Sequence, residues 1–378
     1  MITYPEAIVV GLLQGVSELF PVSSLGHSVL LPALIGGRWA ADLSVSAPES
    51  PYLAFIVGLH VATALALVAF FWRDWVRIVR GLITSIRYRR IENADERLAW
   101  MIVIATIPVG LAGLLLEHTF RTTLGRPIPA AFFLIVNGGI LYGAERLRRR
   151  AAGDDLARRR PVLVSSDGRG TVYSSRTAAA PAAVEPAASG AMLAGATHTT
   201  DAIVEPATLG PSGALRSPAV SVGPHAASRH SADGHNSLLH DEGDAVESDE
   251  RLTKRSFRQT TLIGAAQILA LLPGISRSGV TMAAGLLRGL SHEDAARFSF
   301  LLATPVILAA GVLKLPDLTG PLGAGIGGQV FVGSLASGIG AYVSVRWLTK
   351  YFQTRTLTPF AIYCAVAGVL SLLWLSLV

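Results

Sequence analysis

The fold is decided by two short stretches of the sequence, FPVSSLGH at Phe20–His27 and PGISRSG at Pro273–Gly279. Each stretch interrupts an apolar segment, Tyr4–Ile35 in the first case and Thr260–Leu290 in the second. The arms beside the breaks are about 11 to 17 residues long, whereas a helix needs about 20 residues to cross a membrane. Arms of this length around a Pro, Gly and Ser cluster suit a helix-loop-helix that enters and leaves a membrane by one face. The sequence therefore predicts two re-entrant segments.

The two segments are copies of an internal repeat. They align without gaps at an offset of 253 residues, and several positions around the breaks are identical. Each copy is one re-entrant segment followed by three spans, and because three is odd, the second copy enters from the opposite side. This predicts an inverted-topology repeat whose two breaks meet near the membrane midplane. The identical pairs include Gly11 and Gly264, Gln14 and Gln267, Ser23 and Ser276, and Gly26 and Gly279.

The composition indicates an all-α polytopic membrane protein. Of the 378 residues 51% are apolar and 15% are charged, whereas a soluble domain carries about 25% charged residues. The single cysteine, Cys364, excludes an internal disulfide. Six further apolar runs are long enough to cross a membrane as helices. They are Tyr52–Trp72, Leu98–Glu117, Ile128–Glu145, Phe298–Leu315, Val330–Leu348 and Pro359–Val378.

Residues 151–257 differ from the rest of the chain. This stretch holds 13 of the 26 acidic residues, is rich in Ala, Ser, Thr, Gly and Pro, and has no sustained helical or alternating period. Such a composition is typical of disorder. We therefore predict a first membrane repeat at residues 1–150, a disordered insertion at 151–257 and a second membrane repeat at 258–378. Four histidines lie five residues apart in the insertion, a spacing that suits no helical face, and we interpret it as chance rather than a metal site. They are His225, His230, His235 and His240.

Arginine marks the expected cytoplasmic side. It is concentrated in the loops after the first and third spans, at residues 73–97 and 146–150, and the positive-inside rule places such loops in the cytoplasm. The rule also explains the net charge of +6 without a nucleic-acid partner. Both termini and the first re-entrant segment then lie outside, and the insertion lies in the cytoplasm. No positive charge precedes the first apolar stretch, so we expect it to be retained rather than cleaved as a signal peptide.

Two charged residues stand out in apolar surroundings. Glu18 lies four residues after Gln14, so the two side chains share a helical face, and a carboxylate at membrane depth usually lines a polar cavity. Arg277 is the only basic residue between Arg258 and Arg288, and it requires a carboxylate or a phosphate as partner. The alternatives are an interfacial Glu18 solvated by lipid headgroups and a structural ion pair between Glu18 and Arg277.

Hydroxyl residues come just before a new helix in both breaks. They are Ser23 and Ser24 in the first and Ser276 and Ser278 in the second. Capping a helix is the ordinary role of such serines. Two helix N-termini that face each other with an Arg between them, however, attract anions, and phosphate is the obvious one.

His27 lies one turn inside the first of these helices. There it can accept or donate a proton near neutral pH. His60 and His118 have no such neighbours in the sequence, and we interpret both as structural.

At this point the motifs resemble those of a known family. GLLQGVSELFPVSSLGH at Gly11–His27 and PGISRSGVT at Pro273–Thr281 are similar to the two signature segments of the bacterial undecaprenyl-diphosphatase family, the bacitracin-resistance type. RFSFLLATP at Arg297–Pro305 is similar to a further family segment. The resemblance covers nearly the whole chain apart from residues 151–257. It implies a cell-membrane enzyme that hydrolyses undecaprenyl diphosphate to the monophosphate lipid carrier and inorganic phosphate at the outer face.

The resemblance also assigns roles to residues. The acidic motif of the family falls on Gln14 and Glu18, and many members have Glu where this chain has Gln14, which leaves one carboxylate fewer for a Mg²⁺ or Ca²⁺ ion bridging the diphosphate. Either Ser24 or water is the nucleophile. The residues expected to be catalytic are Glu18, Ser24, His27 and Arg277; those expected to bind phosphate are Ser23, Ser276, Arg277, Ser278 and Thr281; Gln14 and Glu18 are the candidate metal ligands.

The implied partners are membrane lipids and a polyprenyl diphosphate substrate for which bacitracin competes, and a homodimer is left open. The main rival is a lipid or ion transporter, because inverted repeats with broken helices are a transporter architecture. A carrier releases its headgroup intact, however, whereas Ser, Arg and His at one site suit a hydrolase. A scaffold protein would leave Arg277 unexplained. Because the insertion joins two cytoplasmic helix ends, we expect deletion of Gly153–Asp249 to leave hydrolysis nearly unchanged.

Overall fold

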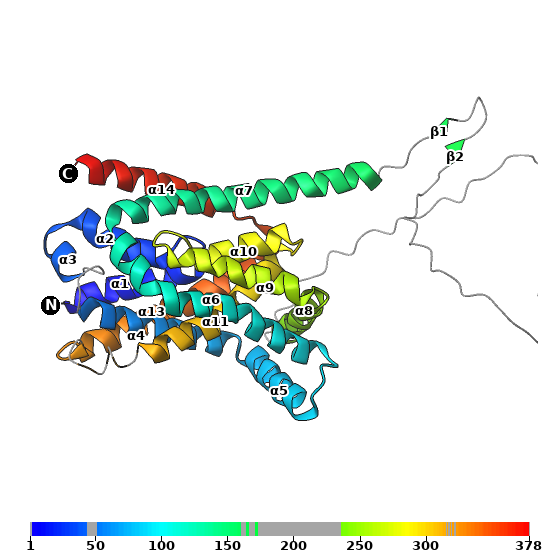
Figure 1. Ribbon diagram of the computed structural model, residues 1–378, viewed down its shortest axis with the longest axis horizontal. Coiled ribbons are helices and arrows are strands. Elements are labelled where there is room, and N and C mark those ends of the chain that lie inside the picture. The colour runs from blue at the N-terminus through cyan, green and yellow to red at the C-terminus, as the bar shows by residue number, and fades with distance from the viewer. Residues whose placement is uncertain are drawn as a thin grey trace, which may run out of the picture. The chain divides into compact units, whose positions relative to one another are not determined.

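The computed structural model describes residues 2–43, 51–159, 164–165, 171–172, 236–314 and 323–377, together with residues 316, 318 and 320 (Figure 1). The chain divides into two compact units. One comprises Met1–Arg158 and Asn236–Val378, and the other Arg159–His235. The described part of the second unit includes an antiparallel pair of two-residue strands, β1 (Val164–Ser165) and β2 (Thr171–Val172).

Among the residues that the structure describes, six helices are long and apolar enough to cross a membrane. Their order along the chain is the order predicted from the sequence, with mean hydropathy between 1.3 and 2.4 in the relevant windows. The all-α, multi-pass membrane architecture is therefore confirmed. The helices are α4 (Pro51–Phe70), α6 (Ala94–Leu124), α7 (Pro127–Arg159), α11 (His292–Leu313), α13 (Gly327–Thr354) and α14 (Thr358–Leu377).

Both interrupted segments form two helical arms around a break. The first consists of α1 (Tyr4–Leu19) and α2 (Ser24–Ile35), followed by the short α3 (Gly37–Asp42). The second consists of α9 (Phe257–Ala265), which continues as the 3-10 helix η1 (Ala266–Leu271), and α10 (Arg277–Leu287). These arms are shorter than the six long helices, as the sequence predicted. Their re-entrant course through a membrane stays a prediction.

The repeat extends to the caps of these arms. Thr3 and Glu6 form a capping box at the start of α1, and Ser256 and Gln259 form one at the start of α9. The two boxes are 253 residues apart, which is the offset of the repeat. Each box satisfies backbone N–H groups that the first turn of a helix leaves unpaired. The first helix of each copy therefore begins with the same capping motif.

Each half of the chain packs its first arm against the other half. α1 packs on α13 and α9 packs on α6, and both contacts depend on a glycine. A β-carbon at Gly11 would collide with the carbonyl oxygen of Gly333, and one at Gly264 would collide with that of Ala105. Small residues allow such close helix approach in membrane proteins. The third spans also meet, since α7 and α14 lie side by side (Figure 1) and Gly138 of α7 faces the backbone of Ala361.

A helix that the sequence analysis did not predict follows the first span. α5 (Trp72–Tyr88) occupies the Arg-rich loop and is amphipathic. Asp74, Ile78 and Ser85 face inward, whereas apolar side chains such as Ile83 and Ile86 are exposed. Exposed apolar residues beside arginines are typical of a helix that lies in the membrane interface.

The predicted boundaries of the insertion are wrong at both ends. α7 continues beyond residue 151 to Arg159, and a further helix, α8 (Asn236–Thr253), precedes the second repeat. α8 packs against α6 and α11. The physical reason is that Asp249 of α8 is the partner of the buried Arg297. The amino-acid composition of the segment does not reveal this pairing. The predicted disorder of residues 173–235, and the histidines 225, 230 and 235, lie outside the described residues, as does the side chain of His240.

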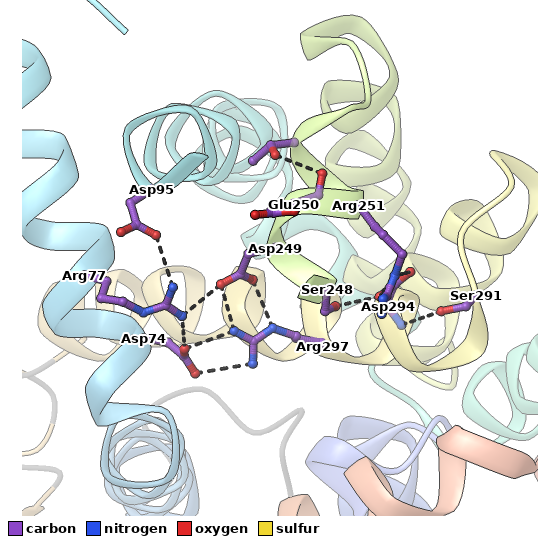
Figure 2. Close-up of polar contacts among 11 residues, drawn as sticks. Asp74, Arg77, Asp95, Ser248, Asp249, Glu250, Arg251, Ser291, Asp294 and Arg297 are labelled. Carbon is purple, nitrogen blue, oxygen red and sulfur yellow. Dashed lines mark hydrogen bonds and ion pairs between the residues drawn. The ribbon is translucent and has the colours of Figure 1, made fainter. Parts of the chain in front are cut away.

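An ion cluster attaches α8 to the membrane unit (Figure 2). Arg297 of α11 is 9% exposed and donates to both carboxylate oxygens of Asp249, at 3.0 and 3.1 Å, as well as to Asp74 of α5. Arg77 donates to Asp74, to Asp249 and to Asp95 of α6. Burial raises the pKa of the Asp249 carboxyl, while Arg297 and Arg77 act in the opposite direction. The cluster thus joins α5, α6, α8 and α11.

A second contact lies one turn away on the same helices (Figure 2). Arg251 of α8 donates to both oxygens of Asp294, and Ser248 donates to the same carboxylate at 2.6 Å. Asp249 and Ser248 are each 1% exposed. A deletion that ends at Asp249 would remove both residues and leave Arg297 without its bidentate partner. We therefore expect a deletion that stops before α8 to be tolerated better than the deletion of Gly153–Asp249.

Candidate functional site

The carboxylate of Glu18 joins the two broken segments. Its Oε1 pairs with the Arg277 guanidinium at the start of α10, and its Oε2 accepts the Ser24 hydroxyl at 2.5 Å. Oε2 also accepts the Gln14 amide at 2.8 Å. Glu18 is 7% exposed. Four of the residues singled out from the sequence, on α1, α2 and α10, are thus brought within hydrogen-bonding distance.

The two break loops touch each other beside this carboxylate. A β-carbon at Gly26 would lie 2.9 Å from the α-carbon of Gly274, whose φ of 106° itself favours glycine. Asn137 of α7, which is fully buried, bridges the loops by donating to the Pro21 carbonyl and accepting the Ser276 N–H, each at 3.1 Å. The sequence analysis missed Asn137, because a lone Asn in an apolar span has no local signal. The starts of α2 and α10 are therefore held close together.

The other predicted phosphate-binding hydroxyls are engaged with the backbone. Ser23 caps α2 by accepting the Gly26 N–H at 3.2 Å, and Ser276 caps α10 by accepting the Gly279 N–H at 3.1 Å. Ser278 donates to the Phe20 carbonyl, and Thr281 donates to that of Arg277. All four side chains are at most 3% exposed. They shape the loops around Arg277, and their contact with phosphate stays a prediction.

His27 lies on the first turn of α2 with both ring nitrogens occupied. Nδ1 lies 2.7 Å from the Ser23 carbonyl, so Nδ1 carries the proton, because a carbonyl oxygen only accepts. Nε2 then accepts the Tyr363 hydroxyl at 2.8 Å, and the two rings are stacked. Tyr363 of α14 is a further residue of the site that the sequence did not reveal.

His60 corrects the sequence-based interpretation. We interpreted it as structural, yet its Nε2 lies 3.2 Å from Gln14 Nε2 and 3.5 Å from Glu18 Oε2. The separation of 42 positions between Glu18 and His60 concealed this proximity, which arises because α4 packs against α1. The side chain of His118 lies outside the described residues.

The site offers few ligands to a cation. Among the described residues there is no group of three or more His, Cys, Asp and Glu that suits a metal ion. Gln14 Oε1, however, is buried and has no hydrogen-bond partner, and it lies on the side chain next to the Glu18 carboxylate. Mg²⁺ is often held by one or two protein oxygens and completes its shell with substrate phosphate and water. The two oxygen donors therefore fit such an ion.

Comparison with known proteins agrees with this geometry. The family described as "Bacitracin resistance protein BacA" matches residues 7–164 and 232–370, which include both broken segments and α8. An "Undecaprenyl-diphosphatase" of Mycolicibacterium paratuberculosis is 57% identical over 376 residues, covering 100% of this chain and 98% of the relative. "Undecaprenyl-diphosphatase 1" of Frankia casuarinae is 52% identical with 97% of each chain covered, and a relative from Granulibacter bethesdensis with the name "Undecaprenyl-diphosphatase" is 33% identical over 98% of this chain and 96% of its own. The chain therefore belongs to the bacitracin-resistance BacA family.

Proposed function

We propose that this protein hydrolyses undecaprenyl diphosphate to undecaprenyl phosphate, the lipid carrier of cell-wall synthesis, and inorganic phosphate. The names of its relatives support this substrate. The observation that carries the proposal is the Glu18 carboxylate, which holds an Arg from one half of the chain and a Ser from the other. The proton acceptor Glu18, the hydroxyl of Ser24 and the guanidinium of Arg277, which can bind phosphate, are thus brought together beside the starts of α2 and α10.

Without substrate, Glu18 and Arg277 neutralise each other. A diphosphate competes for the guanidinium, whose planar fork suits two phosphate oxygens. The N–H groups at the starts of α2 and α10 add partial positive charge where the leaving phosphate develops negative charge. The groups that stabilise the negative charge of the leaving phosphate are therefore in place before the bond breaks.

Two routes lead to the same products. In one, Ser24 Oγ attacks the terminal phosphorus while Glu18 Oε2 takes its proton, the bond to the lipid monophosphate breaks, and water then hydrolyses the phosphoserine. In the other, a water held by Ser24 and Glu18 attacks directly. The 2.5 Å contact between Ser24 and Glu18 supports Glu18 as the proton acceptor in both routes. His27, paired with Tyr363, is the second group able to move a proton.

A divalent cation would be held by Gln14 Oε1 and Glu18. When bound, it would neutralise charge on the diphosphate. Mg²⁺ or Ca²⁺ suits these oxygen donors.

The proposed location is the bacterial cell membrane, with the site towards the outer face and residues 160–235 in the cytoplasm. The six apolar helices support a multi-pass protein, and the arginines of α5 support the orientation. The polyprenyl tail then stays in the bilayer while the headgroup enters between α1, α2 and α10. Bacitracin would compete for the same diphosphate.

The test is release of inorganic phosphate from a polyprenyl diphosphate by the purified full-length protein in detergent. We expect release by the wild type and loss of release in Glu18→Gln. A wild-type protein that releases no phosphate but moves the intact lipid across liposomes would instead be a transporter.

A further inference from the structure

His60 is an exception in its helix. It is the only Asp, Glu, Lys, Arg or His in α4, and it lies in the middle of that apolar span. Ionisable residues in such positions are costly and usually functional. Its side chain is 28% exposed and lies beside Gln14 and Glu18. A purely structural role would not require this placement.

The ring of His60 has one orientation in the site. Nδ1 lies 2.9 Å from the Ile56 carbonyl, one turn earlier in α4. Since a carbonyl only accepts, the ring donates from Nδ1, and in this tautomer Nε2 presents a lone pair to Gln14. The ring therefore acts as an acceptor towards the site.

The Gln14 amide is consequently held at both of its hydrogens. One is donated to Glu18 Oε2 at 2.8 Å, and the other points to His60 Nε2 at 3.2 Å. If the amide were turned by half a revolution, Gln14 Oε1 would face two acceptors. The two neighbours thus select a single amide orientation, and in this orientation Gln14 Oε1 is buried without a hydrogen-bond partner.

We propose that His60 is a positioning residue for hydrolysis: it fixes the Gln14 amide, which in turn holds the Glu18 carboxylate in place to accept the Ser24 proton. The inference rests on the proposed hydrolysis and adds a residue to it.

The experiment compares kcat and KM of full-length variants in detergent, with polyprenyl diphosphate as substrate. His60→Leu removes both nitrogens at similar volume, and we expect kcat to fall about tenfold with KM changed less than about twofold. His60→Gln supplies an oxygen that accepts from Gln14, so it should retain most of kcat. In a Gln14→Leu background, His60→Leu should add little further loss, because residues that act through each other are not additive.

Thr63→Ala is the matched control. Thr63 lies one turn further along α4, is fully buried and bonds to Ser337 of α13 at 3.0 Å. This variant should lower the thermal unfolding midpoint and leave kcat unchanged. The role of His60 is overturned if His60→Leu keeps the wild-type kcat, if His60→Gln is as impaired as His60→Leu, or if the losses of Gln14→Leu and His60→Leu add. A wild type that releases no phosphate overturns the proposed function and this inference together.

Discussion

At the scale of single residues, the site depends on one carboxylate with several partners. Glu18 balances the charge of Arg277, accepts from Ser24 and is held by Gln14. Isolated charges are expensive in a membrane, but a charge with this many partners is not isolated. Each partner can therefore be tested by a substitution that changes one property at a time.

Arg277→Lys keeps the positive charge and loses the planar fork. We expect kcat/KM for phosphate release to fall roughly 30-fold, which corresponds to about 2 kcal/mol of lost transition-state binding. Arg288→Lys, an exposed position at the end of the same helix, is the control and should behave as wild type. Full turnover by Arg277→Lys would remove this residue from the phosphate site.

Glu18→Gln keeps the size of the side chain and removes the proton acceptor. We expect kcat to fall at least about 100-fold, the lower end of general-base effects. The measurement is the single-turnover rate, which excludes product release as the slow step. A rate within a few-fold of wild type would assign proton acceptance to another group.

Gln14→Glu adds a second carboxylate on the same helical face as Glu18. We expect hydrolysis to be tolerated and to respond more strongly to Mg²⁺ or Ca²⁺, since each added carboxylate strengthens a hard-cation site. A titration of activity with Mg²⁺ measures this. A response identical to that of wild type would argue against a shared cation site.

The sequence predicted these residues because they are adjacent to breaks in apolar segments, where polar groups have no ordinary explanation. It could not predict His60, Asn137 or Tyr363. Each lies within a long apolar helix, far along the chain from its partner. Their roles arise only when α4, α7 and α14 pack around the breaks, and a local pattern carries no information on that packing.

At the scale of elements, the six spans and both breaks follow from apolar run length and from Pro, Gly and Ser. α5 and α8 were missed for different reasons. α5 has a readable signal, since Val76, Val79, Ile83 and Ile86 recur at helical spacing between arginines. α8 has no such signal, because its acidic residues suggest solvent and only the packed structure reveals Arg297 as the partner of Asp249.

The ion cluster gives a prediction at this scale. Asp249→Ala leaves Arg297 buried without its bidentate partner, and breaking a buried pair costs about 3 to 5 kcal/mol. Asp95→Ala removes a more exposed partner of Arg77 and should cost at most about 1 kcal/mol. Unfolding in detergent, followed by tryptophan fluorescence, compares the two. Equal destabilisation would mean that α8 is not anchored by this contact.

At the scale of the whole molecule, each half of the chain packs part of its structure against the other half. The first arm of each half packs on the second span of the other, and the site lies where the two breaks meet. Family coverage ends at residue 164 and resumes at 232. The family match therefore does not include residues 165–231.

Two deletions test this division. Replacing residues 160–235 with a flexible linker should leave phosphate release within a few-fold of wild type, because each doubling of loop length changes the closure cost by only about 0.6 kcal/mol. Replacing residues 153–249 also removes Ser248 and Asp249, and should lower the unfolding midpoint and the yield of active protein. If both deletions behave alike, α8 contributes nothing to the core.

The offset of 253 residues also shows why one copy alone is incomplete. The position that corresponds to Glu18 in the second copy is Leu271, and the one that corresponds to Arg277 in the first copy is Ser24. The carboxylate therefore comes from the first copy and the guanidinium from the second, so neither copy could form this ion pair with a duplicate of itself.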